Sequence, residues 1–382
     1  MAKLLLFEEV PQAWVDGLAS FLRERQPEGI PLDLVMLAPS ATQDSEALLG
    51  SAEVIVVGLT GQQAPLTGEI IAKAPALRLI QKLGSRAAGV DLDAARQASV
   101  QVSLLPAPAH IACAEHTMLL ILALAKKLIP AHQKVTRRPL KEIGRAPKPA
   151  AAGDYAYNWA GLDGIGLVAG RTLGLVGIGD IAIEVARRAK AFGLNVIYCD
   201  KDGLPQDEER TLGIERREMD ALVAEADIVS LHVALTPETQ GILNAERMGK
   251  MKASAFVINT ARGGLVDEEA LATALREGRL AGAALDAWAA EPTPKDNPLL
   301  KLDNVVATPH VAAGTLTKTA IFEAILPNIL KAFRGETVVG SLTPEVTPKP
   351  AREPEPPVAE PPAPETPPAD ASDGSDRSDE SD

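Results

Sequence analysis

Cysteine is nearly absent from this chain of 382 residues. The two cysteines, Cys113 and Cys199, lie far apart in the sequence, with neither the spacing of metal ligands nor a second pair that could build a disulfide framework. We therefore expect a reducing, cytoplasmic compartment and no metal site.

Aromatic residues and long apolar runs are also scarce. Aromatic side chains make up 3% of the sequence and no basic stripe accompanies them, which argues against nucleic-acid binding. No stretch of about 18 uncharged apolar residues occurs, and the apolar run at residues 4–7 is too short for a signal peptide. We expect neither a membrane span nor export.

Basic residues are outnumbered, above all at the end of the chain. The net charge is −13, and residues 341–382 hold eleven acidic residues against three basic ones, so this segment carries −8 of it. It also holds eleven of the thirty prolines. Such a composition cannot offset the entropy of ordering, so we predict a disordered acidic, proline-rich tail over 341–382. A docking or solubilising arm is the alternative.

The rest of the chain has a repeating α/β pattern. Short β-branched or leucine-rich runs alternate with helical patterns, which is typical of doubly wound parallel sheets. Five runs predict a flavodoxin-like substrate domain over residues 1–104, completed by 311–340, and six predict a Rossmann dinucleotide-binding domain over 105–310. The helical segment 115–131 has almost no polar face and should be buried on most sides. The expected strands are 4–7, 34–37, 54–57, 77–83 and 100–104, then 172–176, 195–198, 227–232, 256–259, 281–285 and 304–307.

A glycine loop opens the second series of strands. The motif Gly-Ile-Gly-Asp-Ile-Ala at 177–182 follows an expected strand and begins a helix, which is the context that a dinucleotide-binding loop requires. Gly177 permits a tight turn, and Gly179 lets the backbone approach a pyrophosphate. The pyrophosphate would lie on the helix N-terminus, beside the backbone of Asp180 and Ile181. The alanine that ends the motif is an accepted variant.

Two acidic residues near this loop bear on the cofactor. The charge of Asp180 should repel phosphates unless its side chain turns outward; alternatively, Asp180 is a helix-terminal acid that the helix dipole favours. Asp200, at the end of the next expected strand, can accept hydrogen bonds from a ribose diol and repel a 2′-phosphate. We predict NAD rather than NADP, although Lys201 could partly relieve that repulsion.

Three polar motifs follow later strands. Arg262 lies in Asn-Thr-Ala-Arg-Gly-Gly, Glu291 precedes a proline, and His310 ends Thr-Pro-His. Carboxyl ends of parallel strands meet at one edge of a sheet, so a guanidinium, a carboxylate and an imidazole should converge there. Taken singly, each has an ordinary explanation: a surface ion pair, a loop acid, a structural histidine. Their coincidence beside a nucleotide loop predicts coupled transfer of a hydride and a proton.

Together these motifs resemble the D-isomer-specific 2-hydroxyacid dehydrogenase family. The resemblance implies an NAD-dependent oxidoreductase that interconverts a 2-oxo acid and a D-2-hydroxy acid. It covers residues 77–333, while residues 1–76 agree only in pattern. The matching segments are 114–116, 174–182, 232–239, 259–267, 283–286, 291–292 and 308–310.

The resemblance implies roles for the three polar residues. Arg262 would grip the substrate carboxylate and polarise the 2-oxo group. His310 would deliver a proton to the carbonyl oxygen and take it back in the reverse direction. Glu291 would stabilise the protonated form of His310. In contrast, we expect His116 and His232 to be structural.

The resemblance also implies cofactor contacts. Asp286 would hold the nicotinamide carboxamide. Thr260 and Ala261 would pass beneath the nicotinamide, and Val233 and Ala234 would flank the adenine.

The loop at residues 83–87 resembles the family's substrate loop. Its backbone amides, around Ser85, would meet the substrate carboxylate across an interdomain cleft that closes during turnover. Arg86 stands where many relatives have glycine. It is either a second anion clamp, for a diacid or a phosphorylated acid, or a residue that points to solvent.

Other functions stay open on the sequence alone. Glu291 disfavours formate dehydrogenases, which use glutamine there, whereas phosphonate-type dehydrogenases use a similar constellation. Some relatives of this fold are NAD-sensing corepressor-like scaffolds, and deletion of the residues after 340 would separate a scaffold from an enzyme. For the enzyme we expect a small-molecule 2-oxo or 2-hydroxy acid as partner, and a homodimer through the 115–131 helix.

Overall fold

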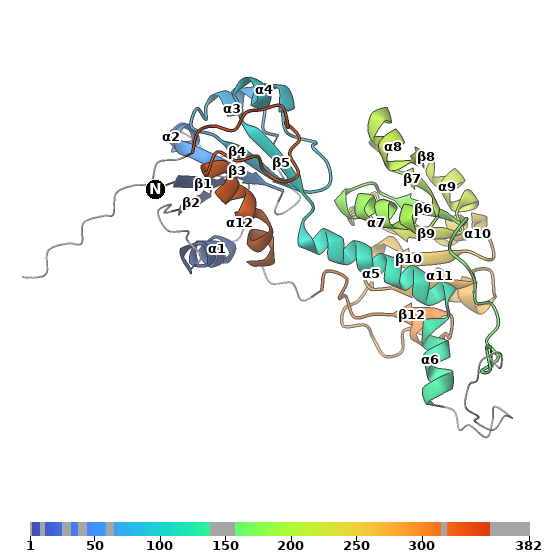
Figure 1. Ribbon diagram of the computed structural model, residues 1–382. Helices are drawn as coiled ribbons and strands as arrows, with labels where there is room; N and C mark the ends of the chain where they lie inside the picture. Colours follow the sequence, from blue (N-terminus) through green and yellow to red (C-terminus); the bar gives the residue numbers. More distant parts are fainter. Residues whose placement is uncertain are drawn as a thin grey trace, which may run out of the picture.

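Two parallel sheets, one in each of two lobes, organise the computed structural model (Figure 1). Helix α5 (Pro108–Ala125) leads from the first lobe into the second. The α/β class with two doubly wound sheets is therefore confirmed. The structure describes residues 2–7, 12–24, 32–36, 44–58, 65–137, 157–314 and 319–351.

The first sheet has the strand order β2-β1-β3-β4-β5, with all neighbours parallel. This is the flavodoxin-like order. Helices α1 and α12 cover one face and α2, α3 and α4 cover the other, so the strands read as apolar runs without alternation. The strands are β1 (Ala2–Leu6), β2 (Leu32–Met36), β3 (Ala52–Val57), β4 (Leu79–Leu83) and β5 (Gln101–Leu105). The helices are α1 (Gln12–Glu24), α2 (Asp44–Ser51), α3 (Gly68–Ala72), α4 (Leu92–Gln97) and α12 (Thr319–Phe333).

The second sheet has the order β12-β11-β10-β9-β6-β7-β8. The chain leaves β6 towards β7 and β8, then returns to its other side with β9, and this reversal creates the crevice in which dinucleotides bind. β8 was not predicted, because it is short and two of its three residues are charged. The strands are β6 (Thr172–Val176), β7 (Asn195–Cys199), β8 (Ile214–Arg216), β9 (Ile228–Leu231), β10 (Phe256–Asn259), β11 (Gly282–Leu285) and β12 (Val305–Ala307). The α-helices between them are α7 (Asp180–Ala191), α8 (Gln206–Leu212), α9 (Met219–Glu225), α10 (Ala245–Lys250) and α11 (Glu268–Arg276).

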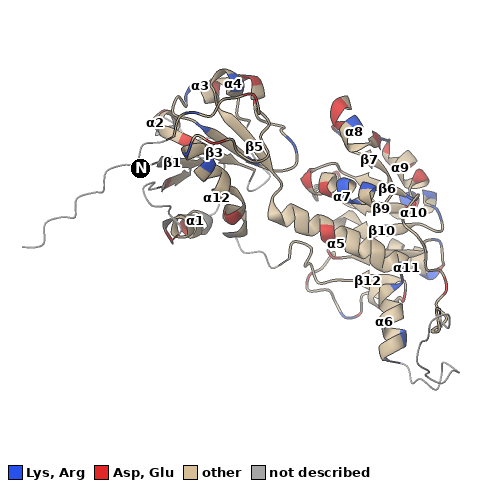
Figure 2. Cartoon of the chain, in the orientation of Figure 1, with Lys and Arg blue, Asp and Glu red and all other residues tan. Residues whose placement is uncertain are grey.

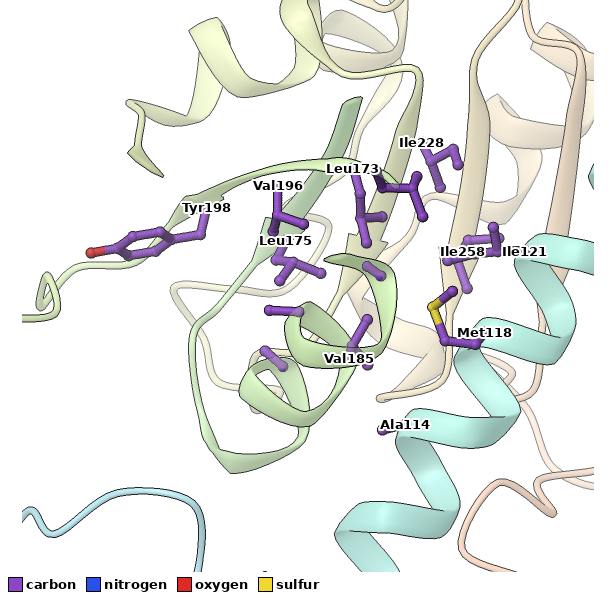
Figure 3. Close-up of a cluster of buried hydrophobic side chains, with 14 of the residues drawn as sticks. Ala114, Met118, Ile121, Leu173, Leu175, Val185, Val196, Tyr198, Ile228 and Ile258 are labelled. Carbon is purple, nitrogen blue, oxygen red and sulfur yellow. The ribbon is translucent and has the colours of Figure 1, made fainter. Parts of the chain in front are cut away.

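Helix α5 is apolar nearly all round and belongs to the second core. Ala114, Met118 and Ile121 join Ile258 of β10 in one buried cluster (Figure 3). Among the described residues, α5 is the one helix long and apolar enough to cross a membrane, and half of that stretch is buried inside the protein. It begins earlier than the expected start at 115, because a proline is tolerated in the first turn.

The apolar segment that we expected to run on to residue 131 is broken after α5. Lys127 has a left-handed backbone (φ 50°), and a separate helix, α6 (Leu128–Thr136), follows it.

Helix α12 returns to the first lobe and closes its core. Phe322 lies with its ring centroid 6.4 Å from that of Phe21 in α1. Asn328, almost fully buried, donates hydrogen bonds to Gln81 Oε1 (3.1 Å) and Ser103 Oγ (2.8 Å) of the first sheet. The first lobe is therefore built from two separated parts of the chain.

Residues 341–351 are part of the first lobe, so the prediction of a disordered tail from 341 is wrong for this segment. The N–H of Leu342 donates to the Val102 carbonyl (2.8 Å), and the Thr343 hydroxyl accepts from the Val102 N–H (3.0 Å). The physical reason is that β5 is an edge strand, whose exposed backbone groups can pair with a passing segment. Residues 352–382 lie outside the described residues.

Candidate functional site

The glycine loop lies at the carboxyl end of β6. Gly177 has φ 94°, and a Cβ there would lie 2.8 Å from the His232 carbonyl and from Val233 Cγ1, so only glycine fits. A Cβ on Gly179 would meet nothing within 4 Å. The backbone of the loop is therefore open on the side where a pyrophosphate could approach it. Ile181 packs against the margin of the second core.

Asp200 lies beside this loop, as predicted. Its Oδ2 accepts the Ile178 N–H (2.8 Å), and its Oδ1 accepts the Asp202 N–H (3.1 Å). The side chain of Lys201 is exposed and lies 4.0 Å from Asp202 rather than at Asp200. Arg216 of β8 donates to the carbonyl of Asp200 (2.8 Å), which the sequence did not reveal because β8 itself was not predicted.

Glu291 and His310 form a close pair. The Nδ1 of His310 lies 2.8 and 2.9 Å from the two carboxylate oxygens of Glu291. A carboxylate can only accept, so Nδ1 carries the proton of this bond and Nε2 is the nitrogen available to a ligand. The hydrogen bond with His310, together with the Trp288 N–H (3.0 Å), lowers the pKa of Glu291 from its ordinary value.

Arg262 lies at the same edge of the sheet, in the turn after β10. Asn259 shapes that turn, because its side chain donates to the Arg262 carbonyl (2.9 Å) and accepts the Ala261 N–H (3.1 Å). The exposed guanidinium of Arg262 donates to the Ala261 carbonyl (2.7 Å). Nothing in the motif alone indicated that Asn259 holds the turn.

One cavity brings the three predicted residues together. It has a volume of about 500 Å³, and its lining includes Arg262, Glu291 and His310, with Leu235 and Trp288 as apolar walls. A second cavity of about 630 Å³ shares Glu291 and His310 on its own lining. The structure therefore places a cation, an imidazole and a carboxylate around a space that can hold a small organic acid.

Asp286 is fully buried and secures the turn that carries His310. Its carboxylate accepts the Thr308 hydroxyl (2.6 Å) and the N–H groups of Val311 (2.9 Å) and Ala312 (2.8 Å). Burial opposes its charge, but these hydrogen bonds outweigh burial and lower the pKa of Asp286. His310, whose backbone is left-handed (φ 54°), is held in place by Asp286.

Two buried polar contacts connect α5 to this edge. His116 Nε2 lies 3.1 Å from the Thr308 hydroxyl and 3.4 Å from Asp286. The Thr117 hydroxyl lies 2.9 Å from that of Thr260. His116 thus contacts the polar cluster of the site in addition to packing in the core.

The loop around His232 and Val233 lies against Gly177 of the glycine loop. His232 is half-buried beside Ser230 (2.8 Å), and desolvation of its ring lowers its pKa to about 4, which fits a neutral structural residue. The Ala234 carbonyl accepts the Thr239 hydroxyl (2.7 Å), so this loop is closed on itself.

The predicted substrate residues of the first lobe lie apart from this cavity. The N–H of Ser85 donates to Asp180 Oδ1 (2.7 Å), and its hydroxyl donates to Glu184 Oε1 (3.0 Å). Arg86 lies 3.3 Å from Glu208 of α8 and is largely covered. Arg86 therefore meets the second lobe instead of pointing to solvent, and neither Ser85 nor Arg86 lines the cavity with His310.

Residues 118–312 match the family model described as D-isomer specific 2-hydroxyacid dehydrogenase, NAD binding domain. The chain belongs to this family. Metal-binding clusters of three or more His, Cys, Asp or Glu side chains are absent from the part of the chain that the structure describes. As a member of the family, the protein is an NAD-dependent oxidoreductase that acts on CH–OH groups, so the predictions of the family and of NAD as cofactor are confirmed.

Curated relatives of this 2-hydroxyacid dehydrogenase carry several names. The chain is 36% identical over 274 residues to a glyoxylate reductase of Korarchaeum cryptofilum. This alignment covers 71% of the chain and 78% of the relative. It is 38% identical over 273 residues to a D-3-phosphoglycerate dehydrogenase of Methanocaldococcus jannaschii, covering 71% of the chain and 48% of the relative. The chain thus spans about half the length of the phosphoglycerate dehydrogenase that it matches.

Solved structures agree with the fold of this 2-hydroxyacid dehydrogenase. The PH0520 protein of Pyrococcus horikoshii has a TM-score of 0.52 and 25% identity, covering 91% of this chain and 96% of that one. The D-isomer specific 2-hydroxyacid dehydrogenase of Lactobacillus delbrueckii in its NAD-complexed form has a TM-score of 0.50 and 24% identity, covering 89% and 100%. The second likeness concerns the fold alone.

Proposed function

We propose that this protein interconverts a small 2-oxo acid and a D-2-hydroxy acid, with Arg262, Glu291 and His310 as its catalytic residues. The observation that supports this most is the cavity of about 500 Å³ on which the His310–Glu291 pair and the Arg262 guanidinium converge. A planar two-pronged cation suits the carboxylate of a 2-oxo acid, and an imidazole suits proton delivery to its carbonyl oxygen.

The protein's own groups divide the proton and charge work between them. NAD, when bound, supplies or accepts the hydride. Arg262 binds the substrate carboxylate and polarises the 2-oxo group. His310 holds a proton at Nε2 and releases it to the carbonyl oxygen, and in the reverse direction it accepts the hydroxyl proton there. Glu291 stabilises the imidazolium form through Nδ1.

The cofactor site fits NAD in its residues. The backbone at Gly179 is open to a pyrophosphate that approaches the N-terminus of α7, and Asp200 has a carboxylate beside the glycine loop where a ribose diol would lie. Asp180 and Ile181 would contribute backbone N–H groups. We also propose the remaining contacts that the resemblance implies, which come from Val233, Ala234, Thr260, Ala261 and Asp286.

The role proposed for Asp286 is the most constrained of these. Its carboxylate is already committed to three donors, so its first task in the cofactor-free protein is to hold the His310 turn. A contact with the nicotinamide carboxamide would have to share one of these oxygens.

The substrate is tested by a panel of 2-oxo acids with NADH. Relatives are named glyoxylate reductase, D-3-phosphoglycerate dehydrogenase and, at 38% identity over 253 residues in Thermotoga maritima, hydroxypyruvate reductase. We therefore expect turnover of at least one among glyoxylate, pyruvate, hydroxypyruvate and phosphohydroxypyruvate, followed as loss of NADH absorbance. Retained NADH binding without turnover of any of them would contradict an enzyme and favour a cofactor-sensing scaffold.

We further propose the homodimer expected through the helical segment 115–131, together with the rest of α6 and the residues after 157. Large apolar side chains are exposed on this part of the second lobe, and exposed apolar patches mark association surfaces. They are Leu128, Ile129, Val135, Tyr157, Trp159, Ile165 and Leu167. Sedimentation equilibrium of the wild type should give twice the mass of one chain, and the Val135→Asp variant should give the mass of a single chain. A monomeric wild type would contradict the proposal. The cytoplasmic location stays a prediction.

A further inference from the structure

The substrate loop of the first lobe is held by two carboxylates of the helix that would carry the pyrophosphate. Asp180 accepts the N–H of Ser85 at 2.7 Å, and Glu184 accepts its hydroxyl at 3.0 Å. Asp180 and Glu184 are four residues apart and so lie on one face of α7. Figure 2 shows acidic residues, coloured red on the ribbon, in α7 and α8 of the second lobe. Both hydrogen-bond donors of Ser85, its N–H and its hydroxyl, thus have a carboxylate as acceptor.

Glu184 is a permanent part of this contact. It is almost fully buried and paired with Arg187 and Arg188 of the next turn. Burial opposes its charge, but the hydrogen bonds from Arg188 and Ser85 and the charge of Arg187 hold its pKa below the ordinary value. Displacing Glu184 would break both of these ion pairs and leave Arg188 only the more distant Glu115 (3.7 Å), so Glu184 should stay in place.

Asp180 is the member that can leave. Its second oxygen lies 4.0 Å from His110 Nδ1, and burial lowers the pKa of His110, which disfavours a charged imidazolium beside Asp180. Within the described part of the chain, no lysine or arginine forms an ion pair with Asp180. Its charge is therefore balanced mainly by the Ser85 amide and by the helix dipole.

The contact also has a close fit on the loop side. Gly84 has φ 147°, and a Cβ at this position would lie 2.9 Å from Asp180 Oδ2. A side chain there would push the carboxylate away from Ser85. The loop therefore accommodates a carboxylate against its backbone, which is also what a 2-oxo acid would present to it.

We propose that Asp180 is an internal stand-in for the substrate carboxylate: it occupies the Ser85 amide in the cofactor-free protein and leaves it when NAD binds. This rests on the proposed function together with the contact that the family resemblance implies, in which the backbone amides around Ser85 meet the substrate carboxylate. The pyrophosphate would lie at the N-terminus of α7, beside Asp180, and like charges repel each other there. NAD binding therefore vacates the amide that the substrate needs.

The consequence is a positive coupling between the two ligands. A substrate that meets the cofactor-free protein must displace Asp180, whereas a substrate that meets the NAD-loaded protein finds the amide vacant. By linkage, each ligand then raises the affinity for the other by the same factor, and such factors are typically about 5- to 150-fold.

The test uses oxalate as a probe, because this dicarboxylate has no ketone carbonyl that could accept a hydride. Oxalate is titrated calorimetrically into the full chain with and without NAD. For the wild type we expect oxalate to bind at least about tenfold more tightly with NAD. Asp180→Ala should raise the affinity of the cofactor-free protein for oxalate and bring the coupling factor towards one. Asp207→Ala, which removes an exposed acid in the first turn of α8, should behave as the wild type.

Asp180→Asn distinguishes the hydrogen bond of Asp180 to the Ser85 amide from the negative charge of Asp180. An asparagine oxygen can still accept the Ser85 N–H, but no charge drives it away when NAD binds. We therefore expect less gain in oxalate affinity for Asn than for Ala, and no coupling. Equal gains for Ala and Asn, or an unchanged coupling factor in Asp180→Ala, would overturn the proposal.

Hydrogen exchange at the Ser85 amide gives a second readout that needs no substrate. NAD should speed exchange of this amide in the wild type, because its acceptor leaves, and should have no such effect in Asp180→Ala. Slower or unchanged exchange in the wild type would also overturn the proposal. Failure of the proposed function would appear separately, as a wild type that turns over none of the 2-oxo acids.

Discussion

The carboxyl edge of the second sheet and the loop after β4 in the first sheet differ in how their polar groups are held. At the edge, Asp286 fixes the His310 turn through three donors that stay within one lobe, and Trp288 supports it by donating to the Thr308 carbonyl (2.9 Å). The loop is fixed across the lobes, by carboxylates that accept from Ser85 and pair with Arg86. The proposed catalytic residues thus lie at an edge that is held within one lobe, while the loop after β4 depends on contacts between the two lobes.

The largest effect should come from the guanidinium at the rigid edge. Under the proposed function, Arg262→Ala removes both the carboxylate anchor and the group that polarises the 2-oxo carbonyl, so kcat/KM should fall by about 10³-fold. NAD affinity, measured by fluorescence titration, should survive because Arg262 lies outside the glycine loop. Arg262→Lys, which keeps the charge but loses the fork, should recover only part of the activity. Undiminished turnover in the alanine variant would remove Arg262 from its assigned role.

The next effect should come from the imidazole. His310→Asn keeps a polar side chain but cannot exchange a proton, so kcat should fall by at least about 10²-fold, as is typical of losing a general acid/base. Steady-state kinetics with saturating NADH measure it. A smaller loss would exclude His310 as the proton donor.

Glu291→Gln should weaken the same step without abolishing it. Glu291 holds Nδ1 of His310 in a charge-assisted hydrogen bond, and losing such a bond should lower kcat for 2-oxo acid reduction roughly tenfold at neutral pH. Because the pKa of Glu291 is lowered, its hydrogen bond with His310 persists at pH values above that lowered pKa. The bond is lost as the pH falls through the lowered pKa and Glu291 becomes protonated. A pH–rate profile that superimposes on that of the wild type would argue against this pairing in catalysis.

Asp286→Ala should damage stability as well as rate. It leaves the Thr308 hydroxyl and two backbone N–H groups without their buried acceptor, which should cost about 3 kcal/mol in the free energy of unfolding. Because the pKa of Asp286 is lowered, its contribution is present above the ordinary aspartate pKa and is lost as the pH falls through the lowered value. Urea unfolding measures the loss, and Asp303→Ala, at an exposed acid, should stay within about 0.5 kcal/mol of the wild type.

The smallest effect should be on cofactor choice. Asp200→Ser removes the charge that would repel a 2′-phosphate and leaves Arg216 on the neighbouring strand. The ratio of kcat/KM with NADH to that with NADPH should fall by about tenfold, equivalent to about 1.4 kcal/mol. An unchanged ratio would show that another residue sets the preference.

The contrast between the edge and the loop also explains how far the sequence could predict the site. Gly177, Arg262 and His310 could be found because each follows a recognisable strand, and parallel strands bring their carboxyl ends together whatever the details of packing. The sheets themselves follow from apolar runs of the right length. These are local signals.

Features that depend on contacts between distant segments left no such signal. The short edge strand β8 has only one apolar residue, Ile214, and so escaped a search for apolar runs. The contact between Ser85 and Asp180 joins residues far apart in sequence, and its geometry depends on how the two lobes meet. Asp286 has no motif of its own that would reveal three donors arriving from the turn after β12.

The segment 341–351 changes how the end of the chain can be trimmed. Lys349 donates to the carbonyls of Pro75 (3.1 Å) and Leu77 (2.6 Å), and the Pro350 carbonyl accepts from Arg78 (2.6 Å). Removing everything after residue 340 would therefore strip a strap from the lobe that carries the substrate loop. Lost activity in that truncation would then reflect a damaged scaffold and could be mistaken for a lost binding partner. A stop codon after residue 351 leaves the strap intact and tests the acidic extension alone.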